Sequence, residues 1–313
     1  MSDFSNPIFH DEAKAREWLE ARIWPEGPVC PHCGVIDQAT LMQGKSHRPG
    51  LYQCNACREP FTVTVGTLYE RSKVPLHKWL AATHLMMASK KGMSALEIGR
   101  LLGFSKKTAW FVCHRIRESL REPKAGPLGG EGKTVEIDET YVGGKEKNKH
   151  ANKRVPKAHG GAAMEPVFSL VERGGSVRSH HVETVNAKTL GPIVQKQIHA
   201  SSAIMTDESA TTRLAARGYT IESVNHTAGE YVRGGAHTNT IEGYFSILKR
   251  GIIGTYHHVS STHLKRYLAE FDFRYNHRAT LGFTDADRFN ASLPGIVGKR
   301  MTYRRTRKQP QAV

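Results

Sequence analysis

Apolar side chains recur along this chain at intervals that predict both helices and strands. Intervals of three and four residues predict helices over 11–22, 77–89, 95–102, 106–120 and 189–198, and a long helix from Thr238 onward. Alternation, or a short apolar run bounded by turn residues, predicts strands over 134–138, 166–171, 177–185, 203–207 and 219–224. Ser105 is a suitable N-cap for the fourth helix, Thr189 for the fifth, and Gly174-Gly175 favours a hairpin.

The order of these elements predicts a helical first half and a mixed α/β second half. Prolines and glycines between residues 122 and 130 indicate a linker between the halves. The predicted organisation is an N-terminal helix with a cysteine-rich module over 1–70, a helical domain over 71–122, a linker over 123–133, an α/β domain over 134–290 and a basic tail over 291–313.

Charge points to a polyanionic partner. The chain has 313 residues, with 45 Lys and Arg against 29 Asp and Glu, which gives a net charge of +16. Nucleic acid is the commonest partner of so basic a protein. A membrane surface is the alternative, but no apolar run is long enough to span a bilayer and the N-terminus lacks a signal-peptide pattern. We therefore expect a cytoplasmic protein.

Four of the five cysteines form two Cys-X-X-Cys pairs, Cys30 with Cys33 and Cys54 with Cys57, and twenty residues separate the pairs. Each pair can present two thiolates from one tight turn, and two such turns complete a tetrahedral zinc site. A redox dithiol is the alternative, but it needs only one pair. The spacing therefore predicts a structural Zn²⁺ in a zinc ribbon.

The predicted helices over 95–102 and 106–120 are joined by the turn Gly103-Phe104-Ser105, a layout typical of a helix-turn-helix. The second of these helices would lie in the major groove of DNA. An ordinary three-helix bundle with a solvated charged face is the alternative. The residues expected to contact DNA are Lys106, Lys107, Thr108, Arg115 and Arg117.

Acidic residues end two of the predicted strands. Asp138 lies on the opposite face of its strand from Val135 and Ile137, and Asp207 ends the short apolar strand at 203–207. We expect the two carboxylates to meet at one edge of the sheet, although 69 residues separate them (207 − 138). With a third oxygen ligand they would hold two divalent cations, Mg²⁺ or Mn²⁺, suited to in-line phosphoryl displacement.

The long helix after Thr238 offers two candidates for the third ligand, Glu242 and Asn239. Ile241, Phe245, Leu248 and Ile252 form one apolar stripe, and Glu242 and Lys249 lie along its border two turns apart. Glu242 is favoured because hard cations prefer carboxylates, with a salt bridge or helix cap as its alternative role. Lys249 would steady a phosphate beside the scissile bond.

Two basic stretches, 145–159 and 299–308, show no periodicity. Both are expected to bind phosphates as flexible arms. For the first stretch, a mobile surface loop is a second interpretation, and the two are compatible.

Four longer motifs resemble bacterial insertion-sequence transposases of the DDE type, in the ISXO-like group that carries an N-terminal zinc ribbon. The resemblance runs from Cys30 to about Asn276. Its most specific parts are Val135-Glu136-Ile137-Asp138-Glu139-Thr140-Tyr141-Val142-Gly143-Gly144, His237 to Gly243 with Leu248-Lys249-Arg250, Gly254 to Ser260, and Phe271 to Arg278.

This resemblance implies a ribonuclease-H-like domain that binds terminal inverted repeats, cleaves DNA strands and joins their 3′-hydroxyl ends to target DNA. It implies Asp138 and Asp207 as the first two metal ligands, with Asn239 or Glu242 third and Lys249 as the trailing basic residue. Arg250 is expected to contact DNA beside Lys249. We also expect a homodimer or larger assembly on DNA, at the nucleoid. A DNA-binding regulator without catalysis, and a nuclease without a joining step, are the alternatives.

Overall fold

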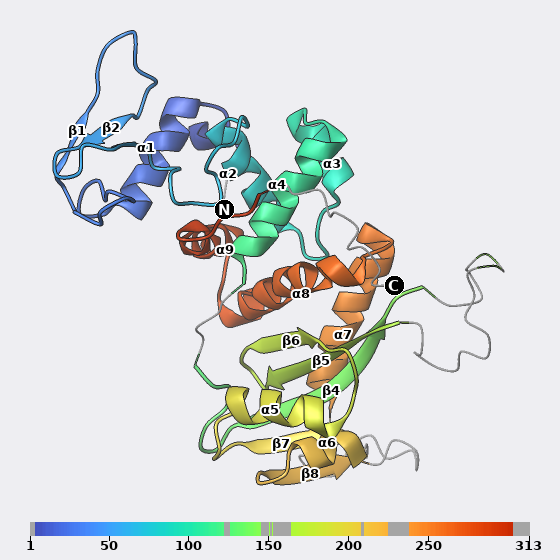
Figure 1. Ribbon diagram of the computed structural model, residues 1–313. Helices are drawn as coiled ribbons and strands as arrows, with labels where there is room; N and C mark the ends of the chain where they lie inside the picture. Colours follow the sequence, from blue (N-terminus) through green and yellow to red (C-terminus); the bar gives the residue numbers. More distant parts are fainter. Residues whose placement is uncertain are drawn as a thin grey trace, which may run out of the picture. The chain divides into compact units, whose positions relative to one another are not determined.

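The computed structural model describes residues 4–121, 126–144, 150, 152, 164–207, 210–224 and 238–302 (Figure 1). Contacts divide the chain into two compact units. Unit 1 contains Met1–Met86, Ala95–Ser119 and Phe289–Val313, and unit 2 contains Met87–Ser94 and Leu120–Arg288. The predicted basic arm over 145–159 lies outside the described residues except for two positions.

Unit 1 is helical apart from the cysteine-rich module. Its helices are η1 (Pro7–Phe9), α1 (Glu12–Ile23), most of α2 (Leu76–Ala88), α3 (Ala95–Leu102) and α4 (Lys106–Ser119). Asp11 caps α1, since its Oδ1 accepts the Lys14 amide at 2.9 Å. Ser105 caps α4 as predicted, because its Oγ accepts the Thr108 amide at 3.2 Å.

The cysteine-rich module is a small antiparallel sheet of β1 (Ala39–Leu41), β2 (Tyr52–Cys54) and β3 (Pro60–Phe61), in that order. Trp24, at the end of α1, lies edge-on to the rings of Tyr52 and Phe61, with centroids 5.5 and 5.7 Å away. The Tyr52 hydroxyl donates to Glu20 of α1 at 3.2 Å. The first helix therefore packs against the module.

The end of the chain completes unit 1. After α9 (Asp285–Ser292) and η6 (Pro294–Ile296), the backbone returns to the segment that follows the cysteine-rich module. The Leu68 amide donates to the Ile296 carbonyl at 3.0 Å, and the Gly298 amide donates to Gly66 at 2.9 Å. Residues 291–302 are thus folded, in contrast to the predicted tail, and residues 303–313 lie outside the described residues.

Unit 2 is built on a five-stranded sheet with the order β6-β5-β4-β7-β8. Its strands are β4 (Thr134–Val142), β5 (Glu165–Glu172), β6 (Val177–His181), β7 (Ala203–Asp207) and β8 (Thr220–Val224). The first three pair antiparallel, while β7 pairs parallel with both β4 and β8. Gly174, at φ +68°, makes the predicted hairpin turn between β5 and β6.

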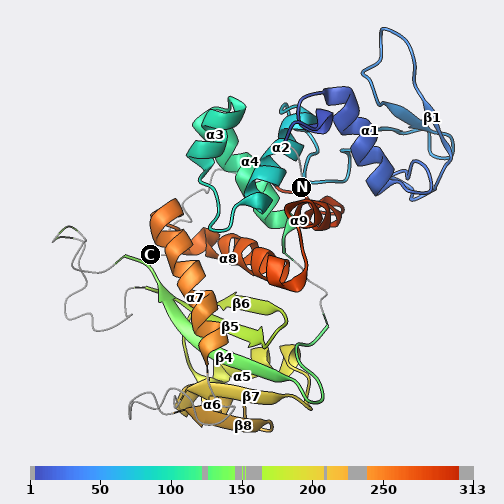
Figure 2. The same cartoon turned by 180° about the vertical axis from the view of Figure 1, so that it is seen from behind.

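Helices cover both faces of this sheet, as Figures 1 and 2 show. One face carries α5 (Ala187–Gln197) and α6 (Ala210–Ala215). The other carries α7 (Asn239–Gly251), which continues as the π-helical turn η4 (Ile252–Tyr256), and α8 (Ser261–Asn276), followed by η5 (Ala279–Leu281). Among the helices that the structure describes, none is long and apolar enough to cross a bilayer.

Alternation along each strand assigns its side chains to one face or the other. Ile137 and Leu170 pack in the core on the α5 side, whereas Val167 and Val171 pack with Ile241 of α7. Even-numbered positions of β4 therefore face α7 and α8. Asp138 lies on this face, opposite the apolar side of its strand as predicted.

Three boundaries differ from the predictions. β4 continues past Asp138 to Val142 because its whole length pairs with β5, with Asp138 opposite Ser169. β6 ends at His181 instead of 185. The cap of α5 is Asn186, whose Oδ1 accepts the Thr189 amide at 2.8 Å, so Thr189 is inside the helix.

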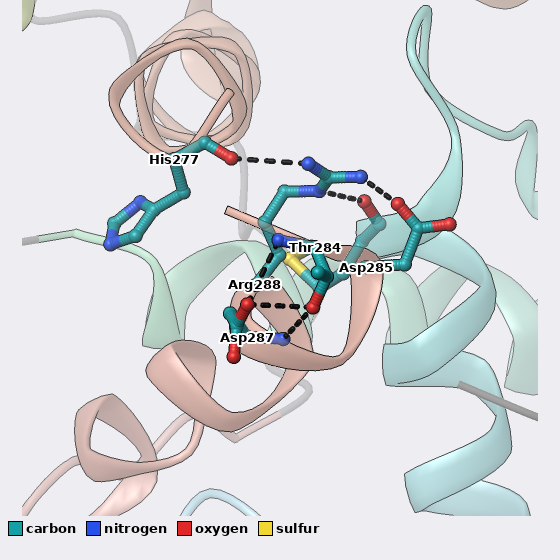
Figure 3. A network of polar contacts seen from close by, with 6 residues as sticks. His277, Thr284, Asp285, Asp287 and Arg288 are labelled. Atoms are coloured by element: carbon teal, nitrogen blue, oxygen red, sulfur yellow. Dashed lines mark hydrogen bonds and ion pairs between the residues drawn. The ribbon is translucent and has the colours of Figure 1, made fainter. Parts of the chain in front are cut away.

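One arginine joins three helix ends within unit 2 (Figure 3). The Arg288 guanidinium donates to the Met87 carbonyl near the end of α2 at 3.0 Å and to the His277 carbonyl after α8 at 3.1 Å. It also pairs with Asp285 in the first turn of α9. A positive charge is favourable at helix C-termini, where carbonyls lack helical partners.

Candidate metal centres

The four paired cysteines lie together in unit 1. Their sulfur atoms all lie within 4.8 Å of one another, and Cys30–Cys57 and Cys33–Cys54 are each 3.7 Å apart. A disulfide would need about 2.05 Å. Tetrahedral Zn–S bonds of about 2.3 Å put sulfurs roughly 3.8 Å apart. The cluster therefore has the dimensions of a structural zinc site.

Both cysteine turns have the same backbone design. Gly34 and Arg58 each follow the first cysteine of a pair by four residues, and each has a positive φ, +78° and +63°. Each donates its amide to the carbonyl of that first cysteine, at 2.9 and 3.0 Å. In the second turn, amide hydrogen bonds from Cys57 and Ala56 lower the pKa of Cys54 to about 6. This favours the thiolate of Cys54, the form that binds metal, whereas burial and the neighbouring thiols raise the pKa of Cys57.

In unit 2, Asp138 and Asp207 lie on neighbouring parallel strands at the same level. The register pairs Thr134 with Ala203 and Glu136 with Met205. Two residues further along each strand are Asp138 and Asp207. Adjacent strands are about 4.8 Å apart, and positions in register share a face. The two carboxylates therefore project from one face of the sheet as neighbours.

The negative charges of these carboxylates act on one another. Burial and the nearby charge of Asp207 raise the pKa of Asp138 to about 7, with further contributions from Glu139 and Glu242. The Glu139 amide opposes this by donating to Asp138 Oδ1 at 2.8 Å. Crowded carboxylates that resist ionisation fit a cation site, because a bound cation supplies the missing positive charge.

Glu139 was not among the predicted ligands. Burial and the charge of Asp207 raise the pKa of Glu139 as well. Its Oε2 is buried and has no hydrogen-bond partner within the described part of the chain. Its position directly after Asp138 was the available signal, but strand alternation assigns it to the other face.

The third predicted ligand lies in the first turn of α7. Glu242 is exposed, its charge acts on Asp138, and its Oε1 accepts the Thr238 hydroxyl at 3.2 Å. Asn239 is also exposed, and its amide side chain carries no charge. Of the two candidates, Glu242 is thus the one that belongs electrostatically to the cluster.

The acidic cluster is more open than the cysteine cluster. Across the described ranges, no second group of three or more His, Cys, Asp or Glu side chains is as compact as the four cysteines. Asp207 Oδ1 is held by the Thr212 hydroxyl of α6 at 3.2 Å. Glu242 of α7 is exposed to solvent.

A polar network under α7 fixes the middle of that helix. The Tyr244 hydroxyl, fully buried, donates to Asp272 of α8 at 2.6 Å and lies 2.9 Å from the Ser179 hydroxyl of β6. Ser179 also contacts Ser169, the residue opposite Asp138, at 2.9 Å. The network places α7 and α8 on the Asp138 face and was not predicted.

The basic residues of α7 are accessible. Ile241, Phe245, Leu248 and Ile252 are buried, as the predicted stripe requires. Lys249 and Arg250 are exposed in the last turn, and Arg250 donates to Ser246. Seven residues, two helical turns, separate Glu242 and Lys249 along one side of the helix.

In α4 the predicted DNA contacts divide into two groups. Lys106 and Lys107 are exposed at its start, next to half-buried Thr108. Arg115 and Arg117 are only 6% and 1% exposed. The Arg115 guanidinium donates to the carbonyls of Glu70 and Met301, at 3.2 and 2.9 Å. Both side chains are thus buried in the DNA-free chain, and DNA contact through them stays a prediction.

Comparison with protein families assigns two segments of the chain. Residues 127–276 match the ISXO2-like transposase domain. Residues 10–59 match the transposase zinc-ribbon domain, which contains all four paired cysteines.

Comparison with individual proteins gives one relative of nearly full length. An uncharacterized protein in the transposable element ISH50 of Halobacterium salinarum is 30% identical over an alignment of 284 residues, which covers 85% of this chain and 91% of the relative. Among solved structures, the cryo-electron microscopy structure of the simian T-cell lymphotropic virus intasome in complex with PP2A regulatory subunit B56 gamma contains a similar chain. That chain has a TM-score of 0.26 at 16% identity, over 59% of this chain and 66% of the other, a likeness too weak to bear on function.

Proposed function

The chain belongs to the insertion-sequence transposase family, and we propose that it is a metal-dependent DNA transposase of the DDE type. The observation that best supports this is the acidic cluster. Asp138 and Asp207 are level on neighbouring strands, and the charge of Glu242 reaches Asp138 from α7. Hard oxygen ligands of this kind suit Mg²⁺ or Mn²⁺.

The proposed reaction has two steps that use the same site. Water attacks a phosphodiester at the end of the element, and the bond that breaks leaves a free 3′-hydroxyl. That hydroxyl then attacks a phosphodiester of target DNA, so one P–O bond forms as another breaks. Bound divalent cations would stabilise the attacking and the leaving oxygen in both steps.

The residues of this chain would share the remaining work. Asp138, Asp207 and Glu242 would hold the cations, and Glu139 would add negative charge behind Asp138. Lys249, exposed two turns after Glu242, would bind a phosphate next to the scissile bond. Asn239 would lie beside the site without ligating.

Two features of architecture belong to the same proposal. Three antiparallel strands followed by two parallel ones, with helices on both faces, support a ribonuclease-H-like fold for unit 2. In unit 1, α3, the turn at Gly103 and α4 support a helix-turn-helix, with exposed Lys106 and Lys107 toward DNA.

The partner in this proposal is double-stranded DNA, as terminal inverted repeats and as target. The net charge of +16 supports it, because neutralising phosphates releases counterions. Two ends must be joined together, so the active form would be a homodimer or larger assembly on DNA, at the nucleoid.

The test is incubation of the full chain with a labelled terminal repeat, a target plasmid and Mg²⁺ or Mn²⁺. Wild type is expected to cleave the repeat and join it to the plasmid. Asp138→Asn and Asp207→Asn should bind the repeat but neither cleave nor join it. Binding without cleavage by wild type would instead support a regulator, and cleavage without joining would support a nuclease.

A further inference from the structure

Glu136 is a buried carboxylate in the strand that carries Asp138. It lies two residues before Asp138 on β4, so both side chains belong to the face under α7. Its side chain is 0% exposed. A carboxylate removed from water in this way is stable only when hydrogen-bond donors surround it.

Among the described residues, at least three donors reach this carboxylate, and two of them come from α7. The Ile241 amide donates to Oε2 at 2.9 Å, and the Thr240 hydroxyl donates to Oε1 at 2.9 Å. The third is Arg173, at the end of β5, whose Nε donates to Oε1 at 2.7 Å. We call Glu136, Arg173, Thr240 and the Ile241 amide the Glu136 clamp.

The clamp replaces a local cap at the start of α7. Amides in the first turn of a helix have no helical acceptor and usually bond to the side chain of the preceding residue. Thr238 occupies that position but makes no such bond, and its hydroxyl donates to Glu242 instead. The Ile241 amide instead donates to a carboxylate of the sheet, whose negative charge also suits the positive N-terminus of α7.

The Glu136 clamp connects the helix that carries Glu242 with the strand that carries Asp138. Glu242 directly follows Ile241, whose amide is bonded to β4 two residues from Asp138. The Tyr244 network holds the same helix two residues after Glu242. The turn that carries Glu242 is therefore fixed against the strand that carries Asp138 from both directions.

We propose that Glu136 is a positioning residue, which through α7 sets the distance at which Glu242 joins Asp138 and Asp207 around a divalent cation. The inference rests on the proposed function. Glu136 itself is not a ligand, because donors from α7 and β5 occupy both of its oxygens. Partners that orient metal ligands are commonly worth 10- to 100-fold in metal affinity.

The experiment measures Mn²⁺ binding to the zinc-loaded, DNA-free chain by electron paramagnetic resonance. Thr240→Val removes one donor to Glu136 with little change in volume, and Thr240→Ser keeps the hydroxyl. Thr240→Val is expected to weaken Mn²⁺ binding about tenfold, and Thr240→Ser to stay within about twofold of wild type. Glu136→Gln should weaken it at least as much as Thr240→Val.

A double-mutant cycle then separates positioning from general stability. In the background of Glu242→Gln, Thr240→Val should have no further effect on Mn²⁺ affinity, because the ligand that it positions is already gone. Circular dichroism of each variant at the binding temperature establishes that it is folded. If folded Thr240→Val binds Mn²⁺ like wild type, or weakens it equally in both backgrounds, the positioning role is wrong.

Failure of the proposed function has a different signature. If wild type binds Mn²⁺ no better than Asp138→Asn, the acidic cluster is not a cation site, and the proposed function falls together with the role of Glu136. If wild type binds Mn²⁺ and Asp138→Asn does not, the acidic cluster is a cation site. The comparison of Thr240→Val with Thr240→Ser then decides the role of Glu136.

Discussion

Asp138 and Asp207 stand level with each other on parallel neighbouring strands, each four residues beyond the paired residues Thr134 and Ala203. The pairing brings together two acids that are 69 residues apart in the chain (207 − 138). Burial of Asp138, and after it the nearby charge of Asp207, raise the pKa of Asp138, so its ionised form is disfavoured in the absence of a cation. The ionisation of Asp138 therefore affects the free energy of unfolding.

The first prediction concerns pH. Burial and Asp207 raise the folded-state pKa of Asp138 from 3.8 to about 7, so the folded protein keeps a proton that the unfolded chain has lost. This stabilisation is complete below about pH 4 and is lost as the pH rises through 7. A shift of this size corresponds to about 4 kcal/mol at most.

Urea unfolding between pH 4.5 and 8 without added Mg²⁺ measures the effect. Wild type should lose more stability over this range than Asp138→Asn, which cannot ionise at that position. Added Mg²⁺ should restore wild type at pH 8 and leave Asp138→Asn unchanged. Parallel pH curves for the two proteins would contradict the prediction.

A second prediction separates the two candidates for the third ligand. Glu242→Gln should reduce cleavage of a terminal repeat about 100-fold or more, because the loss of a ligand should exceed the 10- to 100-fold cost of losing an outer partner. Asn239→Ala should reduce it only a few-fold. Both residues are exposed, so neither change should alter the thermal midpoint. The reverse ranking in a cleavage time course would make Asn239 the ligand.

The third prediction uses the matched turns of the zinc ribbon. Gly34→Ala adds a Cβ at a positive φ, where no atom lies within 4 Å, so its cost is conformational, about 1–2 kcal/mol. Arg58→Gly relieves the same strain in the second turn and should not weaken the site. Zinc transfer to a chromophoric chelator should be faster for Gly34→Ala and unchanged or slower for Arg58→Gly.

Removal of zinc itself should unfold the ribbon, because metal binding supplies much of the folding free energy of such a small module. Protease should then cut within residues 30–57, while unit 2 stays resistant. An intact ribbon after complete zinc loss would show that the aromatic contacts of Trp24, Tyr52 and Phe61 suffice.

The fourth prediction separates surface charge from buried charge in α4. Lys106→Gln and Lys107→Gln should each lower the salt dependence of DNA binding by about one counterion, with the thermal midpoint unchanged. Arg115→Met should instead lower the thermal midpoint, because the carbonyls of Glu70 and Met301 lose their donor. A salt slope that changes with Arg115 in a fully folded protein would argue that this side chain reaches DNA.

Features with a local signal could be predicted from the sequence. The Ser105 cap, the Gly174 hairpin, the cysteine spacing and the apolar stripe of α7 depend on neighbours within a few residues, and the structure contains all four. The length of β4 could not be read in this way. It is set by pairing with β5, whose partner residues lie some thirty positions away.

Long-range burial accounts for the other differences. Arg115 looks like a DNA-binding residue because an arginine on a basic helix is normally solvated, yet its acceptors include a carbonyl 186 residues away. Glu136 appears in the sequence as the polar member of an alternating strand. Its proposed role depends on hydrogen bonds with Thr240 and Ile241, more than 100 residues further along the chain. The spacing of apolar and polar residues within one strand cannot predict such a long-range contact.

The return of the last residues to unit 1 affects how the protein is made. Gly66 and Leu68 find their backbone partners in Gly298 and Ile296, which leave the ribosome more than 200 residues later. The first unit to emerge is consequently the last to be finished. A chain that terminates before Ile296 would carry the acidic residues of unit 2 without a completed unit 1. Unit 1 can therefore finish folding only after the whole of unit 2 has been synthesised.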